Sequence, residues 1–359
     1  MQDNNNIGNR LQNFALQYVL SKYTDNIVNL DNGYGDIPSP TLKSITKQTI
    51  KILLAKIGIK KFQFKLQKQR NWQIRHKANE KFSSDYIKSI TTVNYSNVYQ
   101  KGWKNIDVAV VGSDQVWHNW HRNKNELEFY YLEFLPKKKR VSYAASFGFE
   151  DFPEEDLKKH IKGIKGMNYI SCREKSGCKL VKEVIDQEVP HVLDPTLLLT
   201  SNEWQKLLVG ANKYSKTQRN YAFLYFLGDI PTEYKKEISN KIKKKKLKVI
   251  NFLDFTNNSI SSCGPLEFVS LIENADYVFT DSFHCTVFSI LFNKQFEVFR
   301  RKEEGMEKMF GRIEELLVNT GNQNKAFNGI NSNLEAENMN TLRKASIDYI
   351  KKVLNYEVQ

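Results

Sequence analysis

The chain has 359 residues, 40% hydrophobic and 26% charged, a composition that indicates a folded globular protein and excludes a disordered or fibrous one. Lys and Arg outnumber Asp and Glu by 54 to 40, and the formal net charge of +14 favours an anionic partner: nucleic acid, an anionic membrane or a phosphorylated substrate. The length predicts two domains. Four cysteines are too few for a disulfide framework, and we find no signal peptide or membrane-spanning apolar run, so we expect a cytoplasmic protein.

The N-terminal region is predicted to be helical. Apolar side chains recur at helical spacing over residues 9–20, which is typical of an amphipathic helix. Residues 43–100 alternate basic and aromatic side chains in a helical pattern. We interpret them as a helical insertion that packs on one face, with a basic contact surface as the alternative.

Three short apolar runs then predict buried strands of a parallel sheet, at 108–111, 141–146 and 169–172. A helix over 153–165 is expected between the last two strands. The segment 191–196 closes this half of the chain with an Asp-Pro turn.

The second half alternates strands and helices in the same way. Strands are predicted at 221–227, 247–252, 277–280 and 296–299, and helices at 232–243, 265–273 and 284–292. A last amphipathic helix includes Leu342 and Leu354. This alternation predicts an α/β fold of two Rossmann-like halves, residues 1–199 and 200–359, with a C-terminal helix.

Ligands of open α/β sheets bind beyond the carboxyl ends of the strands, so polar side chains that directly follow a strand are candidates for a site. These are Ser113 and Asp114, Ser146, Arg173 and Glu174, and Asp281, Ser282 and His284. Structural alternatives exist for each: Asp114 as a helix cap, Arg173 in an ion pair, His284 as a partly buried histidine. Four polar clusters at four strand ends still favour a functional site.

Six stretches of the chain carry recognisable motifs, and they follow one another over about 300 residues. They are Asn6–Gln17, Val111–Trp117, Val141–Gly148, Ser171–Gly177, Val192–Thr196 and Ala275–Phe288. In this order they resemble the polysaccharide pyruvyl transferase family. The resemblance implies a glycosyltransferase-B-like pair of Rossmann-like domains that face a central cleft, the first of which carries the acceptor.

The resemblance also implies an activity. Pyruvate would move from phosphoenolpyruvate to a hexose of a surface or capsular polysaccharide precursor as a cyclic ketal, with release of phosphate. Phosphoenolpyruvate would be a co-substrate, and no metal or other cofactor is expected. The acceptor sugar would be linked to a lipid or to a nucleotide.

The chain departs from the family pattern at two places. An apolar strand usually precedes the Asn-rich loop, whereas this chain begins Met1-Gln2-Asp3, so we expect either a start site further upstream or a sheet that lacks one strand. The residue after His284 is usually glycine and here is Cys285, which is expected to narrow the pocket. A nucleophilic role for Cys285 is not expected, because the implied reaction needs none.

The implied chemistry assigns roles to these residues. Phosphoenolpyruvate carries a phosphate and a carboxylate, which guanidinium groups bind well; Arg173 is the first candidate, followed by Arg10 and Arg312. Protonation of the methylene carbon needs a general acid, which we assign to His284. Asp114 is predicted to orient or deprotonate the sugar hydroxyls, with Asp281 as its rival. The other predicted substrate-binding residues are Asn9, Ser113, Ser146 and Ser282.

Basic runs at 137–140 and 241–246 have no nucleic-acid module beside them, so nucleic acid is not expected as a partner. Their lysines are either simply solvated or make peripheral contact with the anionic inner face of a membrane. Two other functions stay open. A nucleotide-sugar-dependent glycosyltransferase of the same architecture would need a base-binding pocket, and a noncatalytic polyanion-binding protein would bind in a salt-sensitive way.

Overall fold

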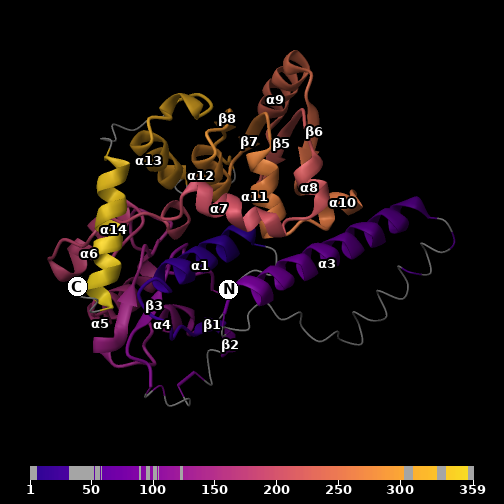
Figure 1. Ribbon diagram of the computed structural model, residues 1–359. Coiled ribbons are helices and arrows are strands. Elements are labelled where there is room, and N and C mark those ends of the chain that lie inside the picture. Colours follow the sequence, from indigo (N-terminus) through magenta and orange to yellow (C-terminus); the bar gives the residue numbers. More distant parts are fainter. Residues whose placement is uncertain are drawn as a thin grey trace. The chain divides into compact units, whose positions relative to one another are not determined.

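The computed structural model describes residues 6–31, 52, 57, 59–88, 90–93, 98–99, 103, 105–121, 124–302, 310–329 and 337–354. The start of the predicted insertion at residue 43 and the beginning of the chain at Met1 lie outside these residues. The protein is mixed α/β, with small parallel sheets (Figure 1). This confirms the predicted α/β class.

The chain divides into two compact units. The first unit comprises residues 1–10, 33–87 and 202–296, and the second comprises 11–32, 88–201 and 297–359. Helix α1 (Ile7–Leu20) begins in the first and continues in the second. The predicted division near residue 200 into two Rossmann-like domains stays a prediction.

The first unit contains a sheet of four strands in the order β6-β5-β7-β8. Its strands are β5 (Tyr221–Tyr225), β6 (Lys248–Asn251), β7 (Tyr277–Thr280) and β8 (Phe296–Val298). Strand β5 runs parallel to both neighbours, with Phe223 opposite Ile250 on one side and Val278 on the other. All four strands lie where the apolar runs predicted them. The central strands β5 and β7 are buried almost along their whole length, as expected for continuous apolar runs, whereas the edge strand β6 is largely exposed.

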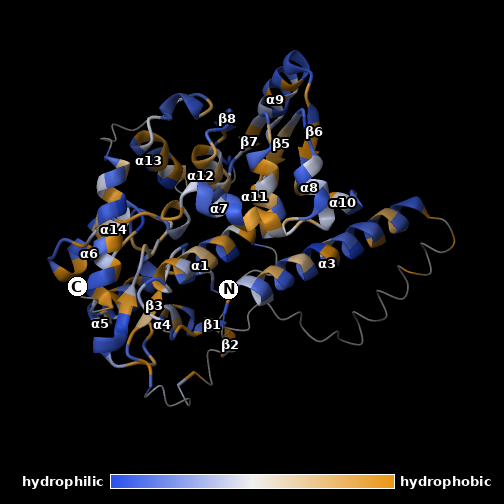
Figure 2. Cartoon of the chain, viewed as in Figure 1, coloured by the Kyte–Doolittle hydropathy of each residue, from blue (hydrophilic) through white to orange (hydrophobic). Residues whose placement is uncertain are grey.

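Helices surround this sheet in the first unit. They are α3 (Lys60–Tyr86), α7 (Ser201–Leu207), α8 (Lys213–Thr217), α9 (Thr232–Lys245), α10 (Asn258–Ser261), α11 (Pro265–Glu273) and α12 (Phe283–Leu291), with the 3-10 turn Leu208–Gly210. Helix α11 begins at a proline, and the Glu267 carboxylate accepts a hydrogen bond from Gly264 N at 2.8 Å. Figure 2 shows α9 as largely hydrophilic and α11 as more hydrophobic, in keeping with their exposure.

The second unit has two small parallel strand pairs. Strand β1 (Asn29–Asp31) pairs with β2 (Ile90–Thr92), and β3 (Ala109–Val111) pairs with β4 (Arg140–Ser142). Isolated bridges continue the second pair through Tyr169, Cys172 and His191.

Three sequence predictions need correction in this unit. The strand predicted at 141–146 is shorter, because Ala144 has a left-handed φ of 50°. The stretch 169–172 forms single bridges rather than a strand. Strand β2 interrupts the predicted insertion after α3, and its alternating exposed and half-buried side chains lack the continuous apolar run of a buried strand.

The remaining helices belong to the second unit. They are α4 (Glu126–Tyr130), α5 (Leu157–Gly166), α6 (Lys175–Ile185), α13 (Gly311–Asn319) and α14 (Met339–Val353), with 3-10 turns at Lys137–Lys139, Glu154–Asp156, Pro195–Leu197 and Gln323–Lys325. Helices α5 and α14 confirm two predicted helices. Among the described residues, no helix combines the length and the apolar character needed to cross a lipid bilayer.

Candidate functional site

The Arg173–Asp194 pair is the centre of the buried polar cluster in the second unit. Nη1 of Arg173 donates to Oδ2 of Asp194 at 2.9 Å, and both side chains are almost fully buried. The same Asp194 oxygen accepts from Ser113 Oγ at 2.9 Å, while the other accepts from the amide and hydroxyl of Thr196 at 3.0 and 2.6 Å. Four hydrogen bonds therefore fix this carboxylate, and it in turn fixes the Arg173 guanidinium.

Two further carboxylates lie beside Arg173. Nη2 is 3.7 Å from Asp114 Oδ1, and Nε is 3.7 Å from Glu174 Oε2. Burial alone would lower the pKa of Arg173, but these carboxylates, with Asp194 foremost, raise it above its usual value. The guanidinium is thus held in its charged form by its surroundings.

Arg312, on α13, belongs to the same electrostatic cluster. Burial and the charge of Arg173 lower its pKa to about 10, against the opposing effects of Glu174 and Asp114. The groups that shift the pKa values of these two arginines include the Arg301 guanidinium and the carboxylates of Asp114, Glu174 and Asp194. An anion bound among charges of both signs would depend on directed hydrogen bonds as well as on positive charge.

Asp114 and Ser146 are linked through their backbones. Ser146 N donates to Asp114 O at 3.0 Å, and Asp114 has a left-handed φ of 59°, which aspartate tolerates better than most residues. No helix begins at Asp114, so the helix-cap alternative is wrong. Ser146 Oγ is buried and has no hydrogen-bond partner among the described residues, which makes it the hydroxyl in this cluster best suited to a ligand.

His284 lies in the first unit, at the N-terminal end of α12. Ser282 caps this helix by accepting from Cys285 N at 3.5 Å. The imidazole packs against Gly8 of α1 so closely that a Cβ built on Gly8 would lie 2.2 Å from His284 Nδ1. A glycine at position 8 is therefore required for this ring position.

Asp281 is engaged by main-chain amides. Its two carboxylate oxygens accept from Leu227 N at 2.8 Å and Gly228 N at 2.9 Å, in the loop that follows β5. These contacts suit a residue that shapes the loop and favour Asp114 over Asp281 as the carboxylate for the sugar. Burial raises the pKa of Cys285 to about 12, so its thiol is a poor nucleophile at neutral pH.

Asn9 and Arg10 stabilise the start of α1. Asn9 N donates to Asn6 Oδ1 at 2.9 Å, which caps the helix. Arg10 is buried, and its Nε donates to Ser83 Oγ of α3 at 3.3 Å. Arg173, Asp114, Ser113, Ser146 and Arg312 come together in the second unit, whereas His284, Asp281, Ser282, Asn9 and Arg10 belong to the first. The predicted position of Asp114 opposite His284 stays a prediction.

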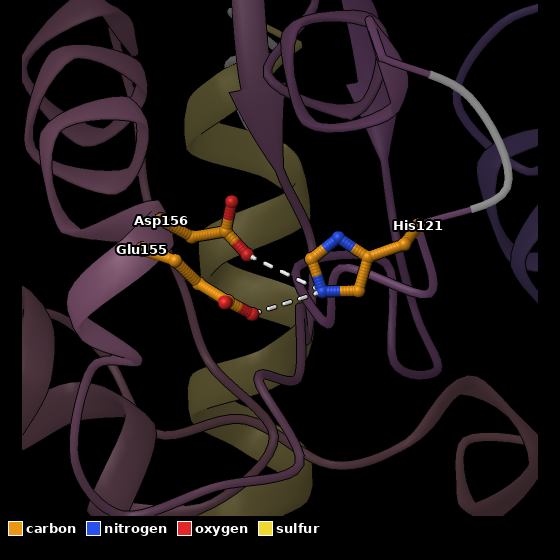
Figure 3. Close-up of side chains that lie close together, drawn as sticks. All are labelled: His121, Glu155 and Asp156. Carbon is orange, nitrogen blue, oxygen red and sulfur yellow. Dashed lines mark ion pairs between the residues drawn. The ribbon is translucent and has the colours of Figure 1, made fainter.

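Within the part of the chain that the structure describes, two groups of side chains have the donor types and spacing that could hold a metal ion. His121 Nε2 lies 3.2 Å from Glu155 Oε1 and 3.9 Å from Asp156 Oδ2 (Figure 3), while His191, Glu315 and Glu337 form the second group. His121 and Glu155 are exposed. Ion pairs of this kind also occur without a metal, and neither group includes a predicted site residue.

Sequence reasoning missed several residues of the buried cluster. Asp194 was read only as part of a turn, although it lies in one of the six motifs; Gln12, which accepts from Ser113 N at 2.9 Å, lies in another. Arg301 carries no sequence signal. Asp194 and Gln12 both lie in motifs that carry the family resemblance, and that position was the signal that could have identified them.

These features describe an α/β protein with buried arginine and carboxylate groups after its strands. The family model for polysaccharide pyruvyl transferase matches residues 6–302. The chain therefore belongs to the polysaccharide pyruvyl transferase family, a family of transferases. A search of curated proteins finds no match to the chain.

Proposed function

We propose that the protein transfers pyruvate from phosphoenolpyruvate to a hexose of a surface or capsular polysaccharide precursor as a cyclic ketal. The observation that carries this proposal is the family match over residues 6–302, which includes all the candidate site residues except Arg312. The finer architecture proposed with it is a pair of Rossmann-like domains of the glycosyltransferase-B type.

The reaction balances without a cofactor. A proton adds to the methylene carbon of phosphoenolpyruvate, a sugar hydroxyl attacks the adjacent carbon, phosphate leaves, and a second hydroxyl of the same sugar closes the ketal. The two hydroxyls release two protons; one replaces the proton given to the methylene carbon and the other leaves with phosphate. His284 is proposed as the proton donor and Asp114 as the carboxylate that receives a hydroxyl proton.

The arginines are proposed to bind the donor. Arg173 is the first candidate, because its guanidinium is buried, charged and held in a fixed orientation by Asp194. Arg312 is a second candidate, because the charge of Arg173 lowers its pKa and the two guanidiniums therefore act on each other. The hydroxyl of Ser146 is proposed to complete the pocket, because it is buried and lacks a hydrogen-bond partner among the described residues.

A turnover assay tests the proposal. Phosphoenolpyruvate is incubated with glucose- and galactose-type acceptors on a lipid diphosphate, without nucleotide, and phosphate release and acceptor mass are measured. We expect one phosphate per acceptor and a mass gain of one pyruvate minus water, with little effect of a chelator. Dependence on a nucleotide sugar would instead identify a glycosyltransferase, and salt-sensitive polyanion binding without turnover would identify a binding protein.

Peripheral contact with an anionic membrane is part of the proposal. The segment from α9 to β6 carries seven exposed lysines: Lys235, Lys236, Lys243, Lys244, Lys245, Lys246 and Lys248. It also carries two acids, Glu233 in the first turn of α9 and Glu237, which pairs with Lys241 at 3.0 Å. Each lysine near an anionic surface contributes about 1 kcal/mol.

Sedimentation with phosphatidylserine vesicles tests this contact. The triple variant Lys243→Gln, Lys244→Gln, Lys245→Gln should lose most of the binding. A control with Lys158→Gln, Lys179→Gln and Lys182→Gln removes the same charge from the second unit and should retain it. Equal binding by both variants would overturn the assignment to α9.

A further inference from the structure

His191 lies at the end of the bridge that joins it to Cys172, and it contacts three different segments of the second unit. Nε2 of the ring is 3.1 Å from the carbonyl oxygen of Arg173 and 3.1 Å from Oε1 of Glu315, on α13. Nδ1 is 2.6 Å from Oε2 of Glu337, which directly precedes the cap of α14. The ring is largely buried, with 13% of the side chain exposed.

These partners hold the ring in one orientation. Nε2 faces the Arg173 carbonyl and the Glu315 carboxylate, and Nδ1 faces the Glu337 carboxylate. The Glu337 carboxylate also lies 3.7 Å from the Lys175 ammonium, so charged residues of different segments meet beside the ring.

The contacts fix the backbone that carries Arg173. Arg173 N donates to Ala145 O at 3.2 Å, and Arg173 O accepts from His191, so both sides of this residue are held. Glu315 Oε2 also accepts from Lys175 N, the first amide of α6, at 3.2 Å. The segment 173–175 is thus anchored by His191 and by one of its carboxylate partners.

His191 also contacts α13, the helix that carries the second arginine, Arg312. Glu315 lies three residues after Arg312 on α13, so the two side chains occupy neighbouring positions on one face of that helix. Burial raises the pKa of Glu315, while the charge of His191 acts in the opposite direction. The contact of His191 with Glu315 therefore connects the ring to α13, which carries Arg312.

We propose that His191 is a positioning residue for the arginines of the donor site. This inference rests on the proposed function, because it assigns donor binding to Arg173 and Arg312. His191 acts through the Arg173 carbonyl and Glu315 and takes no part in the bond changes. The groups that contact the ring are Glu315, Glu337 and the backbone carbonyl of Arg173, and Lys175 lies beside Glu337.

The positioning role is tested by binding and kinetics. In His191→Gln we expect phosphoenolpyruvate to bind about tenfold more weakly, the effect of losing one charge-assisted hydrogen bond, with KM raised and kcat little changed. His121→Gln is the matched control, because His121 also lies beside two carboxylates but does not contact the 173–175 segment (Figure 3). Unchanged KM in His191→Gln, or equal changes in both variants, would contradict the role.

Failure of the proposed function can be distinguished from failure of the role assigned to His191. If the unmodified protein neither binds nor turns over phosphoenolpyruvate, the proposed function fails, and the role assigned here fails with it. If the unmodified protein is active and His191→Gln does not fold, Glu337→Gln serves as the second variant. It should raise KM in the same direction, and an unchanged KM there would overturn the proposal.

Discussion

Asp194 binds Arg173 with one carboxylate oxygen and Thr196 with the other, and Asp254 repeats half of this arrangement elsewhere in the chain. Asp254 Oδ1 accepts from the amide and hydroxyl of Thr256, as Asp194 Oδ1 does from Thr196. Asp254 is half-buried, has no arginine partner among the described residues, and caps its own turn. The two aspartates therefore share the bonds to a threonine and differ in burial, in the Ser113 hydrogen bond and in the ion pair with Arg173.

Comparison of Asp194→Asn with Asp254→Asn measures that difference. Both variants weaken a local cap, but only Asp194→Asn leaves the buried Arg173 charge without its nearest carboxylate. We expect Asp194→Asn to lower the free energy of unfolding by about 3 to 5 kcal/mol and Asp254→Asn by about 1 kcal/mol. Urea titration of both variants provides the measurement, and equal losses would show that the ion pair contributes little.

Arg173→Lys keeps the charge but loses the planar guanidinium, whose Nη1 binds Asp194. A lysine ammonium cannot present two parallel donors, so phosphoenolpyruvate binding should weaken by about 1.5 to 3 kcal/mol. Isothermal calorimetry gives the affinity, and Arg219→Lys, an exposed arginine of the first unit, is the control. Unchanged affinity in a folded Arg173→Lys would remove this residue from the donor site.

The sequence predicts the strands and helices of the first unit well, because its central strands are continuous apolar runs and helices such as α12 begin with a side-chain cap. It predicts the second unit less well. Arg173 and Ser146 were named as candidates because they follow predicted strands, yet 169–172 forms only single bridges, and the partners of the site residues are distant in sequence. The Asp194 contact spans 21 residues and the Gln12 contact with Ser113 spans 101, and no local pattern indicates such pairs.

His284→Gln tests the proposed proton donor. Glutamine keeps much of the size and some hydrogen bonding but cannot protonate carbon, so turnover should fall by about 10² to 10⁴ while phosphoenolpyruvate affinity changes little. Steady-state kinetics give the turnover, and calorimetry gives the affinity for phosphoenolpyruvate. Parallel losses in affinity and turnover would make His284 a phosphate ligand instead.

Gly8→Ala tests whether the His284 ring position matters. The added methyl group would lie 2.2 Å from Nδ1, so the imidazole must move, and turnover should fall by at least about tenfold. The control is the same substitution in a His284→Ala background, where the ring is absent and the clash disappears. If Gly8→Ala lowers turnover by the same factor in both backgrounds, it acts through α1 rather than through the histidine.

The burial of His160 predicts how the free energy of unfolding depends on pH. It is fully buried among Phe147, Phe149 and Phe152, its Nδ1 lies 2.8 Å from the Tyr131 hydroxyl, and burial lowers its pKa from 6.5 to about 4. The unfolded chain then binds a proton more readily than the folded one. The stability that neutral His160 provides is therefore complete above pH 6.5 and declines as pH falls towards 4, by about 2 to 3 kcal/mol.

His160→Gln removes this titration while glutamine can still accept from Tyr131. Its unfolding free energy should depend less steeply on pH between 6.5 and 4 than that of the unmodified protein, because the proton uptake on unfolding is lost. Denaturant titrations across this range give the two slopes, with the exposed His121→Gln as the control that should leave the slope unchanged. Identical slopes for His160→Gln and the unmodified protein would show that His160 is not the group that titrates.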